Sequence, residues 1–544
     1  MKKHPALLKL ALLLLCLALL LPQASLAATK KKTASPSVIR VLLQRLNLKD
    51  EAWMTLEGRY AARGADGTEV LLPAGARITV LLRKDQLVLF HEGLSFAAGN
   101  RLSLLRRQDG DIEPGIRFNL YGGRYPGDLE LTVQDGAIRP VMTLPLETYL
   151  LGVVPYEMSD SFPLEALKAQ AVCARTYALS KIGSSGDWDV VDNTNDQVFR
   201  GIPDQCENTV QAVEATEGLV LTCGGRLITA WYSASNGGQT ELPGNIWGGD
   251  NIPDCFTMTD DPWDLNNPSS TVRTAVLNKD GSGLSRGFLR LLREALASEP
   301  ELKQQGLTDE ETFRVDAIRS VELTTPRYKK PSRLMTTMVI TLAIAGSEYT
   351  VTLDLFPDTV FMLGLSIYGA NNELVTVTEE EDSFTLTSGR YGHGVGMSQR
   401  GAQYQASEGK RTYKQILNFY YPGSKLKRYE GEAAPLPTTN PVLANTPGPM
   451  PTATPRPTLM PVTEELPEGA WLAVVDNIEE NSTVNLREKP SAGAKVLRRL
   501  YWHQPLIVLE EAEVTGWYRV KTDVIEGYIM ASFVQKPEEE EKQE

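Results

Sequence analysis

Short hydrophobic runs with strand character, separated by turn residues, dominate the chain from residue 38 to about residue 140. Apolar side chains then recur at helical spacing over Leu164–Ser180, and a second helical stretch lies near Arg286–Ser298. Strand character returns at 218–234, where Gly224-Gly225 indicates a hairpin, and again at Met338–Leu355. The early strand runs are VIRVLLQRL, RITVLL, QLVLF, ELTVQDG and AIRPV. These patterns predict an α+β fold, in which a mixed, β-rich domain contains a few helices.

The chain has 544 residues, which is too long for one hydrophobic core, so two or three domains are expected. Ten of the 33 prolines fall within Pro435–Pro467, which predicts a semi-rigid linker of roughly 100 Å if it is fully polyproline-like. A small all-β unit and a solvated acidic tail follow it. The expected organisation is a signal peptide at 1–27, a disordered segment at 28–37, a large domain at 38–428, a linker at 429–468, the small unit at 469–536 and the tail at 537–544.

The first residues have the pattern of an export signal. Three lysines accompany the apolar run Leu10–Leu21, which is too short to span a bilayer. Ser25 and Ala27 fit the small-residue cleavage pattern, so we expect cleavage after Ala27, with an uncleaved anchor as the alternative. No later segment is apolar enough to cross a membrane. The sequence therefore predicts a secreted, extracytoplasmic protein.

The net charge limits the classes of partner that are expected, and the cysteines limit the disulfides and metal sites. The formal net charge of −13 argues against nucleic acid as the main partner. Four cysteines remain after signal cleavage, and an exported chain allows disulfides. Cys206 with Cys223 is the first pairing to test, whereas Cys173 lies on the apolar side of a helix and is expected to be a buried free thiol. The cysteine spacing does not resemble a zinc ribbon.

One carboxylate stands out beside the first predicted helix. Glu157 lies between Pro155 and Met158, in a predicted turn just ahead of the helix that starts near Pro163. A carboxyl group on a rigid turn against a packed helix can have its pKa raised, which suits a general acid. Glu147 is a candidate ion-pair partner, and Glu165 complements the dipole at the start of the helix.

Two further clusters are rich in glycine and small polar residues. The segment Ser388–Tyr404, SGRYGHGVGMSQRGAQY, sets His393 among glycines that permit close backbone packing. The segment Trp231–Thr240, WYSASNGGQT, could present hydroxyls and amides to a polar ligand. The plainer alternatives are a histidine that packs in a core and an ordinary polar loop.

Together these clusters resemble the SpoIID/LytB family. The matching phrases are PYEM…FPLEALKAQAVCARTYAL, YSASNGGQTE, GHGVGMSQRGA and YKQILNFYYPGSKL, in the family's order over roughly residues 40–428. The resemblance implies a peptidoglycan lytic transglycosylase that acts on glycan strands, with Glu157 of the P-x-E-M motif as the catalytic acid and no cofactor. Other family members modify a partner amidase, so a non-catalytic wall-binding protein or amidase modifier is the alternative. Sporulation, cell separation and wall turnover all stay open as biological roles.

Several polar residues are candidates for contacting the sugar chain. Gln170 and Arg175 lie on the helix, and Arg175 could equally pair with a core carboxylate. The remaining candidates come from the two glycine-rich clusters and are Ser233, Ser235, His393, Ser398 and Gln399.

The chain departs from the family in the segment after the helix. Several members bind zinc there through Cys and His, whereas this chain has DWDVVDNTNDQVFR at 187–200, with Val191, Asn195 and Asp196 at those places. Because a tetrahedral zinc site needs about four suitable ligands, no metal is expected. Hydrogen bonds from Asp189, Asp192 and Asn195 are the expected substitute for holding the loop.

The C-terminal unit resembles bacterial SH3-like domains through VNLREKPSAGAKVLRRL, GWYRVKT and GYIMASFV. Such domains often bind peptidoglycan, so the resemblance implies wall anchoring, with a simple spacer as the alternative. Trp502, Trp517 and Tyr518 could form a ligand groove or belong to the core of the barrel.

Overall fold

The computed structural model describes residues 38–429, with gaps at 111, 119–122, 184–185, 250–252 and 368, and residues 469–535, with gaps at 476–482, 502–504 and 523–525. The predicted signal peptide, the segment 28–37, nearly all of the linker, the acidic tail and Trp502 lie outside the described residues. Strands outnumber helices and several sheets are present, so the predicted α+β class is confirmed. No helix in the described part of the chain is both long and apolar enough to cross a membrane.

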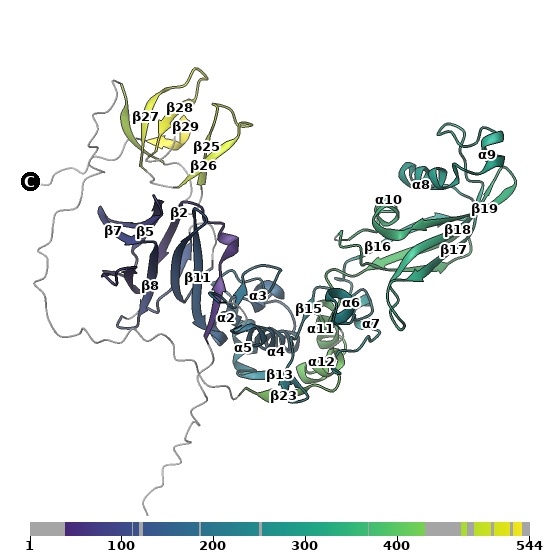
Figure 1. Ribbon diagram of the computed structural model, residues 1–544, viewed down its shortest axis with the longest axis horizontal. Helices are drawn as coiled ribbons and strands as arrows, with labels where there is room; N and C mark the ends of the chain where they lie inside the picture. Colours follow the sequence, from purple (N-terminus) through teal and green to yellow (C-terminus); the bar gives the residue numbers. More distant parts are fainter. Residues whose placement is uncertain are drawn as a thin grey trace, which may run out of the picture.

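The first part of the chain forms two antiparallel sheets around one hydrophobic core, apart from the parallel edge pair β1–β12 (Figure 1). Alternation explains the strands: in β2, Ala52, Met54 and Leu56 are buried while the residues between them are half-buried. The first sheet has the order β12 (Val190–Val191), β1 (Val38–Leu42), β11 (Ala137–Pro145), β10 (Asp128–Gln134), β8 (Arg101–Arg107), β3 (Arg59–Gly64), β4 (Glu69–Leu72). The second has the order β7 (Leu94–Gly99), β6 (Gln86–His91), β5 (Arg77–Arg83), β2 (Glu51–Leu56), β9 (Ile116–Phe118).

Helix α4 (Leu164–Lys181) is the centre of the next layer, as the apolar spacing predicts. It packs against α2 (Leu146–Leu151), α3 (Val154–Glu157), α5 (Glu207–Ala215) and the strand β13 (Leu219–Cys223). Almost every residue from Ala166 to Leu179 is buried, so α4 is enclosed on all sides rather than amphipathic. The predicted hairpin is present, because β13 pairs with β14 (Arg226–Leu227) across Gly224 and Gly225, both at positive φ. The other edge of β13 pairs with β23 (Lys425–Arg428).

Two distant segments complete this layer. β15 (Tyr232–Ser233) runs parallel to β22 (Met397–Ser398), which joins the two glycine-rich clusters of the sequence. The short helices α6 (Pro243–Trp247) and α7 (Pro262–Leu265) follow β15, while α11 (Gln399–Ser407) and α12 (Tyr413–Tyr420) follow β22 and pack against α4.

Residues 272–389 have a hydrophobic core of their own, on the right in Figure 1. Its strands form two three-stranded sheets, and the predicted helix and strands at 286–298 and 338–355 are confirmed here. The elements are β16 (Val272–Asn278), α8 (Arg286–Leu296), α9 (Pro300–Gln304), β17 (Ala317–Pro326), β18 (Met335–Ile344), β19 (Ser347–Asp354), α10 (Val360–Met362), β20 (Leu374–Glu379) and β21 (Ser383–Gly389). The chain therefore leaves the β15 segment, builds this unit, and returns to β22.

The C-terminal unit is a seven-stranded antiparallel sheet around a third core, as predicted for an all-β, SH3-like barrel. Its order is β26 (Val496–Tyr501), β25 (Thr483–Arg487), β29 (Glu526–Met530), β28 (Trp517–Lys521), β27 (Pro505–Glu511), β24 (Trp471–Val475), β30 (Val534–Gln535). Trp517 is buried, and Tyr518 packs against Trp471 with ring centroids 5.9 Å apart, so both belong to the barrel's packing.

All four described cysteines are free thiols, so the expected pairing of Cys206 with Cys223 is wrong. Cys206 instead lies just before α5, where its Sγ is 3.6 Å from the carbonyl oxygen of Pro203. The expectation for Cys173 is confirmed: it is buried, with its Sγ 3.5 Å from the hydroxyl of Tyr421.

Candidate active site

Glu157 is the last residue of α3, so the predicted turn is a four-residue helix instead. Pro155 suits the first turn of this helix because its missing N–H is not needed there. The chain becomes extended at Met158, which is buried in the core beneath. The Glu157 carboxyl group is thereby held at a fixed point between α2 and α4.

Three donors surround the Glu157 carboxyl group. Its Oε1 accepts the backbone N–H of Val198 at 2.9 Å, and its Oε2 accepts the side-chain amide of Gln399 at 3.3 Å. The hydroxyl of Tyr232 is the third partner. Removal from water raises the pKa of Glu157, and the three hydrogen bonds oppose that rise because they favour the ionised form. The pKa of Glu157 is therefore raised overall. A raised pKa suits a carboxyl group that has to carry a proton near neutral pH.

A buried relay fixes the direction of the Tyr232 hydroxyl. The Nε2 of Gln197 donates to the Tyr232 oxygen at 2.9 Å and to the carbonyl of Ala174 at 3.3 Å. The Oε1 of Gln197 accepts from the hydroxyl of Tyr149 at 3.3 Å. Because the Tyr232 oxygen already accepts a hydrogen bond, its own proton is left to point at Glu157.

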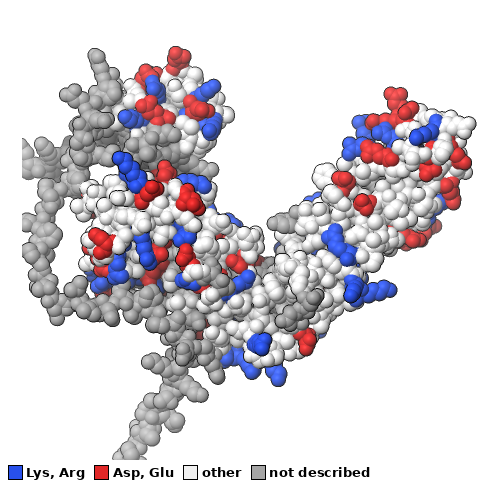
Figure 2. Space-filling view, viewed as in Figure 1, with Lys and Arg blue, Asp and Glu red and all other residues white. Residues whose placement is uncertain are grey.

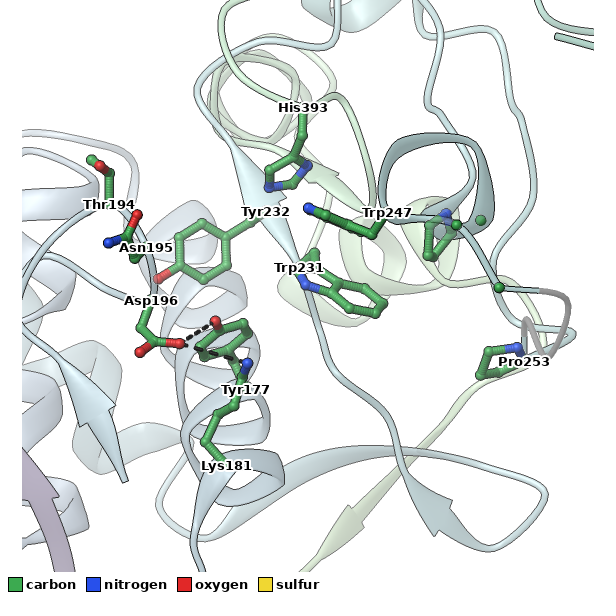
Figure 3. Close-up of a pocket in the computed structure, with 14 residues that line it drawn as sticks. Tyr177, Lys181, Thr194, Asn195, Asp196, Trp231, Tyr232, Trp247, Pro253 and His393 are labelled. Atoms are coloured by element: carbon green, nitrogen blue, oxygen red, sulfur yellow. Dashed lines mark hydrogen bonds and ion pairs between the residues drawn. The ribbon is translucent and has the colours of Figure 1, made fainter. Parts of the chain in front are cut away.

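A pocket of about 710 Å³ is lined in part by Tyr232 (Figure 3). Tyr232 links the pocket to the carboxyl group, because its ring lines the pocket and its hydroxyl reaches Glu157, which is not itself a lining residue. The volume is within the range of small-molecule binding sites. The lining residues are Tyr177, Lys181, Thr194, Asn195, Asp196, Trp231, Tyr232, Pro243, Gly244, Trp247, Gly248, Gly249, Pro253 and His393.

One side of the pocket is aromatic. Trp231 and Trp247 are stacked with ring centroids 4.9 Å apart, and His393 meets Trp247 at 5.0 Å with a steep interplanar angle of 60°. The Nδ1 of His393 accepts the backbone N–H of Val395 at 3.0 Å. Burial lowers the pKa of His393 to about 4, so the ring is neutral at physiological pH.

The facing side is polar, with Thr194, Asn195 and Asp196 across from the rings (Figure 3). Asp196 accepts hydrogen bonds from the Tyr177 hydroxyl at 2.8 Å and the Val191 backbone N–H at 2.9 Å, and its Oδ1 is 3.6 Å from the ammonium of Lys181. This carboxylate is therefore satisfied by its neighbours and holds the loop against α4.

The loop at 187–200 is held by carboxylates, as expected from its lack of zinc ligands. Asp189 binds the Arg40 guanidinium at 2.8 Å and the backbone N–H of Gly183 at 3.0 Å, while Asp192 accepts the backbone N–H of Arg45 at 3.0 Å. The backbone N–H of Asn195 donates to the side chain of Asn193. The role predicted for the Asn195 side chain, holding the loop, is filled by Asp196, which accepts the backbone N–H of Val191. Within the described residues, no three His, Cys, Asp or Glu side chains lie together as a metal site would need.

Two predicted sugar contacts lie at the candidate site. His393 lines the pocket and Gln399 bonds directly to Glu157. Ser235 and Ser398 do not face a ligand: both are buried, and both donate to Asp264, at 2.8 Å each. They tie the β15 loop and the start of α11 to α7, so their predicted role as sugar contacts is corrected to a structural one.

Arg175, Gln170 and Ser233 are also buried, and none of them lines the pocket. Arg175 forms a bidentate ion pair with Glu147, at 2.7 Å for each bond. Pairing with a core carboxylate was the alternative prediction for Arg175, and an ion pair was the prediction for Glu147. Gln170 has no exposed surface, and its amide has no hydrogen-bond partner among the described residues. Ser233 packs with its Cβ facing Gly392, where no side chain would fit.

Tyr232, Gln197 and Trp247 were not predicted as site residues. Tyr232 lies in a segment that contains predicted site residues, and Gln197 lies in the loop that was predicted to be held by hydrogen bonds. Their hydroxyl and amide groups reach Glu157 and Tyr149 only in the folded protein, where α2, α3 and β15 come together. The sequence around Trp247 does not indicate a binding site, because a single tryptophan after Pro243 is as consistent with an ordinary turn as with a ligand contact.

Acidic and basic side chains are mixed on one face of the described part of the molecule (Figure 2). On the face shown in Figure 2, acidic and basic side chains of the described residues alternate, without one continuous basic area.

Comparison with known proteins agrees with the predicted resemblance. Residues 134–223 match the family model of SpoIID, stage II sporulation protein, and residues 482–535 match the bacterial SH3 domain. The amidase enhancer of Bacillus subtilis (strain 168) is 33% identical over 309 residues, which cover 52% of this chain but only 40% of that protein. Stage II sporulation protein D of the same organism is 26% identical over 317 residues, covering 55% of this chain and 79% of the relative. An uncharacterized protein of Brachyspira hyodysenteriae is 27% identical over 420 residues, covering 73% and 94%.

The SpoIID match begins in β10 and ends with β13. It includes Glu157, the whole of α4 and the polar loop of the pocket, but neither the aromatic side nor Gln399. The predicted resemblance is confirmed: the chain carries a SpoIID-family domain at 134–223 and a bacterial SH3 domain at 482–535.

Proposed function

We propose that this protein acts on the bacterial cell wall as a lytic transglycosylase that cleaves peptidoglycan glycan strands. The bond broken joins N-acetylmuramic acid to N-acetylglucosamine, and the product carries a 1,6-anhydro end. The observation that carries the proposal is Glu157, a carboxyl group with a raised pKa, held by three donors next to a pocket with aromatic and polar sides.

The proposed reaction needs one carboxyl group. Protonated Glu157 donates its proton to the leaving glycosidic oxygen as the bond to C1 breaks. The C6 hydroxyl of the same sugar then attacks C1, and the Glu157 carboxylate takes the hydroxyl proton. Because this nucleophile belongs to the substrate, its effective concentration is high and no second catalytic carboxylate is needed. Asp196 faces the same pocket, but its three partners suit a structural role.

The hydrogen bonds to Glu157 serve both halves of this cycle. They lower the free energy of the carboxylate formed after the first proton transfer, so the buried charge is not left uncompensated. They also fix which way the carboxyl group faces, through Gln399 from one side and Tyr232 from the other.

A second candidate function comes from the amidase enhancer, whose name indicates an effect on an amidase. In that case this chain would bind glycan strands without cleaving them and would raise the activity of a partner wall amidase. In either case the bacterial SH3 domain would serve to hold the protein at the wall, in an extracytoplasmic location.

Digestion of glycan strands without stem peptides tests the proposal. The purified full chain should release products with anhydro ends, detected by mass spectrometry, and Glu157→Gln should release none while its thermal unfolding is unchanged. Glu165→Gln is the matched control and should leave turnover intact, since Glu165 bonds only Lys168 of the same helix and the backbone N–H of Tyr413 at the start of α12 among the contacts of the described residues. Binding without products from the unaltered protein, together with faster digestion by an added wall amidase, would favour the amidase modifier.

A further inference from the structure

The indole of Trp247 is half exposed at the edge of the pocket. Trp247 is 51% exposed, although one face of its ring stacks on Trp231 at an interplanar angle of 26°. Trp231 in turn packs on Phe256 at 5.4 Å, so the inner ring is anchored in the core. Trp247 is therefore not an isolated surface residue: with Trp231 and His393 it forms one aromatic cluster that lines the pocket.

The orientation of Trp247 is fixed before any ligand arrives. One face of its ring stacks on Trp231, and the ring of His393 meets it at a steep angle (Figure 3). His393 is itself fixed by the hydrogen bond from the backbone N–H of Val395. The residue ends α6, and the chain turns away through Gly248 and Gly249, both at positive φ. A ring fixed in this way loses little side-chain entropy when a ligand packs on it.

The pocket offers two unlike surfaces to a ligand. Trp247 offers the apolar ring face that does not stack on Trp231, while Thr194, Asn195 and Asp196 offer hydrogen-bonding groups on the facing side. A pyranose ring has the matching shape, since one of its faces is lined by C–H bonds and its rim carries hydroxyl and acetamide groups. A lipid chain would leave the polar side without partners, which is costly. The charge of Asp196 is balanced by Lys181, so an uncharged sugar fits this wall.

We infer that Trp247 is the stacking platform for an N-acetylhexosamine ring of the glycan strand, in the pocket that adjoins Glu157. The inference deepens the proposed function, on which the identity of the ligand rests. Tyr232 connects the two parts, because its ring lines this pocket and its hydroxyl bonds Glu157. Sugar bound at Trp247 would therefore hold the strand in place while its neighbouring glycosidic bond meets the acid.

Binding measured without turnover tests this role. The full chain carrying Glu157→Gln is titrated by calorimetry with the tetramer of N-acetylglucosamine and with peptide-free glycan strands. Adding Trp247→Ala should raise Kd about tenfold, the scale of one good aromatic contact. Trp247→Phe keeps a ring and should lose less. Phe361→Ala is the matched control and should leave Kd unchanged, because Phe361 is 69% exposed on α10, on the surface of the unit of residues 272–389.

Binding and product release, measured together, separate this inference from the proposed function. If Trp247→Ala reduces the thermal stability, Trp247→Leu replaces it, since leucine keeps apolar volume but offers no ring face. Unchanged Kd in all Trp247 variants, with products still released by the unaltered protein, overturns the stacking role and leaves the transglycosylase. Loss of binding in Trp247→Ala, with no products from the unaltered protein, supports the stacking role and overturns the transglycosylase.

Discussion

The side-chain amide of Gln399 donates to Oε2 of Glu157 at 3.3 Å, across 242 residues of sequence. This contact joins the start of α11 to the end of α3, and the unit of residues 272–389 is inserted between the two segments. A hydrogen bond to the ionised form of a carboxyl group lowers its pKa, so Gln399 limits how far burial raises the pKa of Glu157.

Replacing Gln399 should therefore move the pH dependence of turnover. Glu157 must be protonated to start the reaction, so activity falls as pH rises through its pKa. Gln399→Leu removes a donor that favours the carboxylate, raises the pKa of Glu157 further, and shifts the alkaline limb of the kcat/KM profile to higher pH. Gln403→Leu, on the same helix and bonded to Asn267 and Arg400, is the control that should leave the limb in place. A shift to lower pH, or none, would contradict the role of Gln399.

Tyr232→Phe should reduce turnover far more than it reduces folding. The change removes the hydroxyl that orients Glu157 and leaves the Nε2 of Gln197 with one acceptor fewer. Loss of correct orientation can cost about 10²-fold in rate, so we expect kcat to fall on that scale, with KM little changed. Steady-state kinetics on glycan strands measures both constants.

Tyr60→Phe is the control for Tyr232→Phe. Tyr60 also has a buried hydroxyl, which donates to the carbonyl of Gly127 within the first sheet. This variant should lose stability without a specific effect on kcat. Equal loss of kcat in both variants would mean that the tyrosine at 232 acts only through folding.

Arg175 and Glu147 should behave as a structural pair. Arg175→Ala leaves a carboxylate without its partner and exposes the carbonyls of Leu219 and Val213 to an empty space, so unfolding should become easier by about 3–5 kcal/mol. Denaturant unfolding measures this loss. Lys168→Ala, on the same helix but in a partly exposed pair with Glu165, should cost about 0.5 kcal/mol or less. A folded Arg175→Ala protein with weaker glycan binding but unchanged stability would restore Arg175 as a sugar contact.

The helices and strands could largely be predicted because they depend on local patterns. The apolar spacing over Leu164–Ser180 and the glycine pair at 224 and 225 each correspond to an element of the structure. The separate core at 272–389 was not distinguished, because strand and helix signals there look like those on either side. Its existence depends on which residues pack together, which a local pattern does not contain.

The candidate site was predicted in part for a similar reason. Glu157, His393 and Gln399 lie in distinctive motifs, and all three are found at or beside the pocket. Ser235 and Ser398 stand in the same motifs, yet both turn to Asp264, whose position in α7 the motifs do not reveal. A polar residue in a glycine-rich loop can face the site or bind a neighbouring loop, and only the partner that its side chain reaches in the fold separates the two.

Asp261 should make stability depend on pH. It is fully buried, and burial together with the nearby charge of Asp264 raises its pKa to about 6, although Tyr420 and Asn236 each donate to it at 2.8 Å. In the unfolded chain its pKa is lower, so the folded state holds a proton that the unfolded state releases between about pH 4 and 6. Stability from this residue is therefore present at low pH and is lost as pH rises through 6, by at most about 3 kcal/mol.

Asp261→Asn removes this titration while keeping the size and one acceptor of the side chain. The difference in Tm between the unaltered protein and the variant should shrink or reverse as pH rises from about 4 to about 7, because only the unaltered protein must then bury a charge. Asp280→Asn provides the contrast: Asp280 is exposed and its pKa is lowered by the hydroxyl and backbone N–H of Ser282, so its contribution has the opposite sign. Parallel Tm curves for the unaltered protein and Asp261→Asn would show that Asp261 is ionised in the folded protein throughout this range.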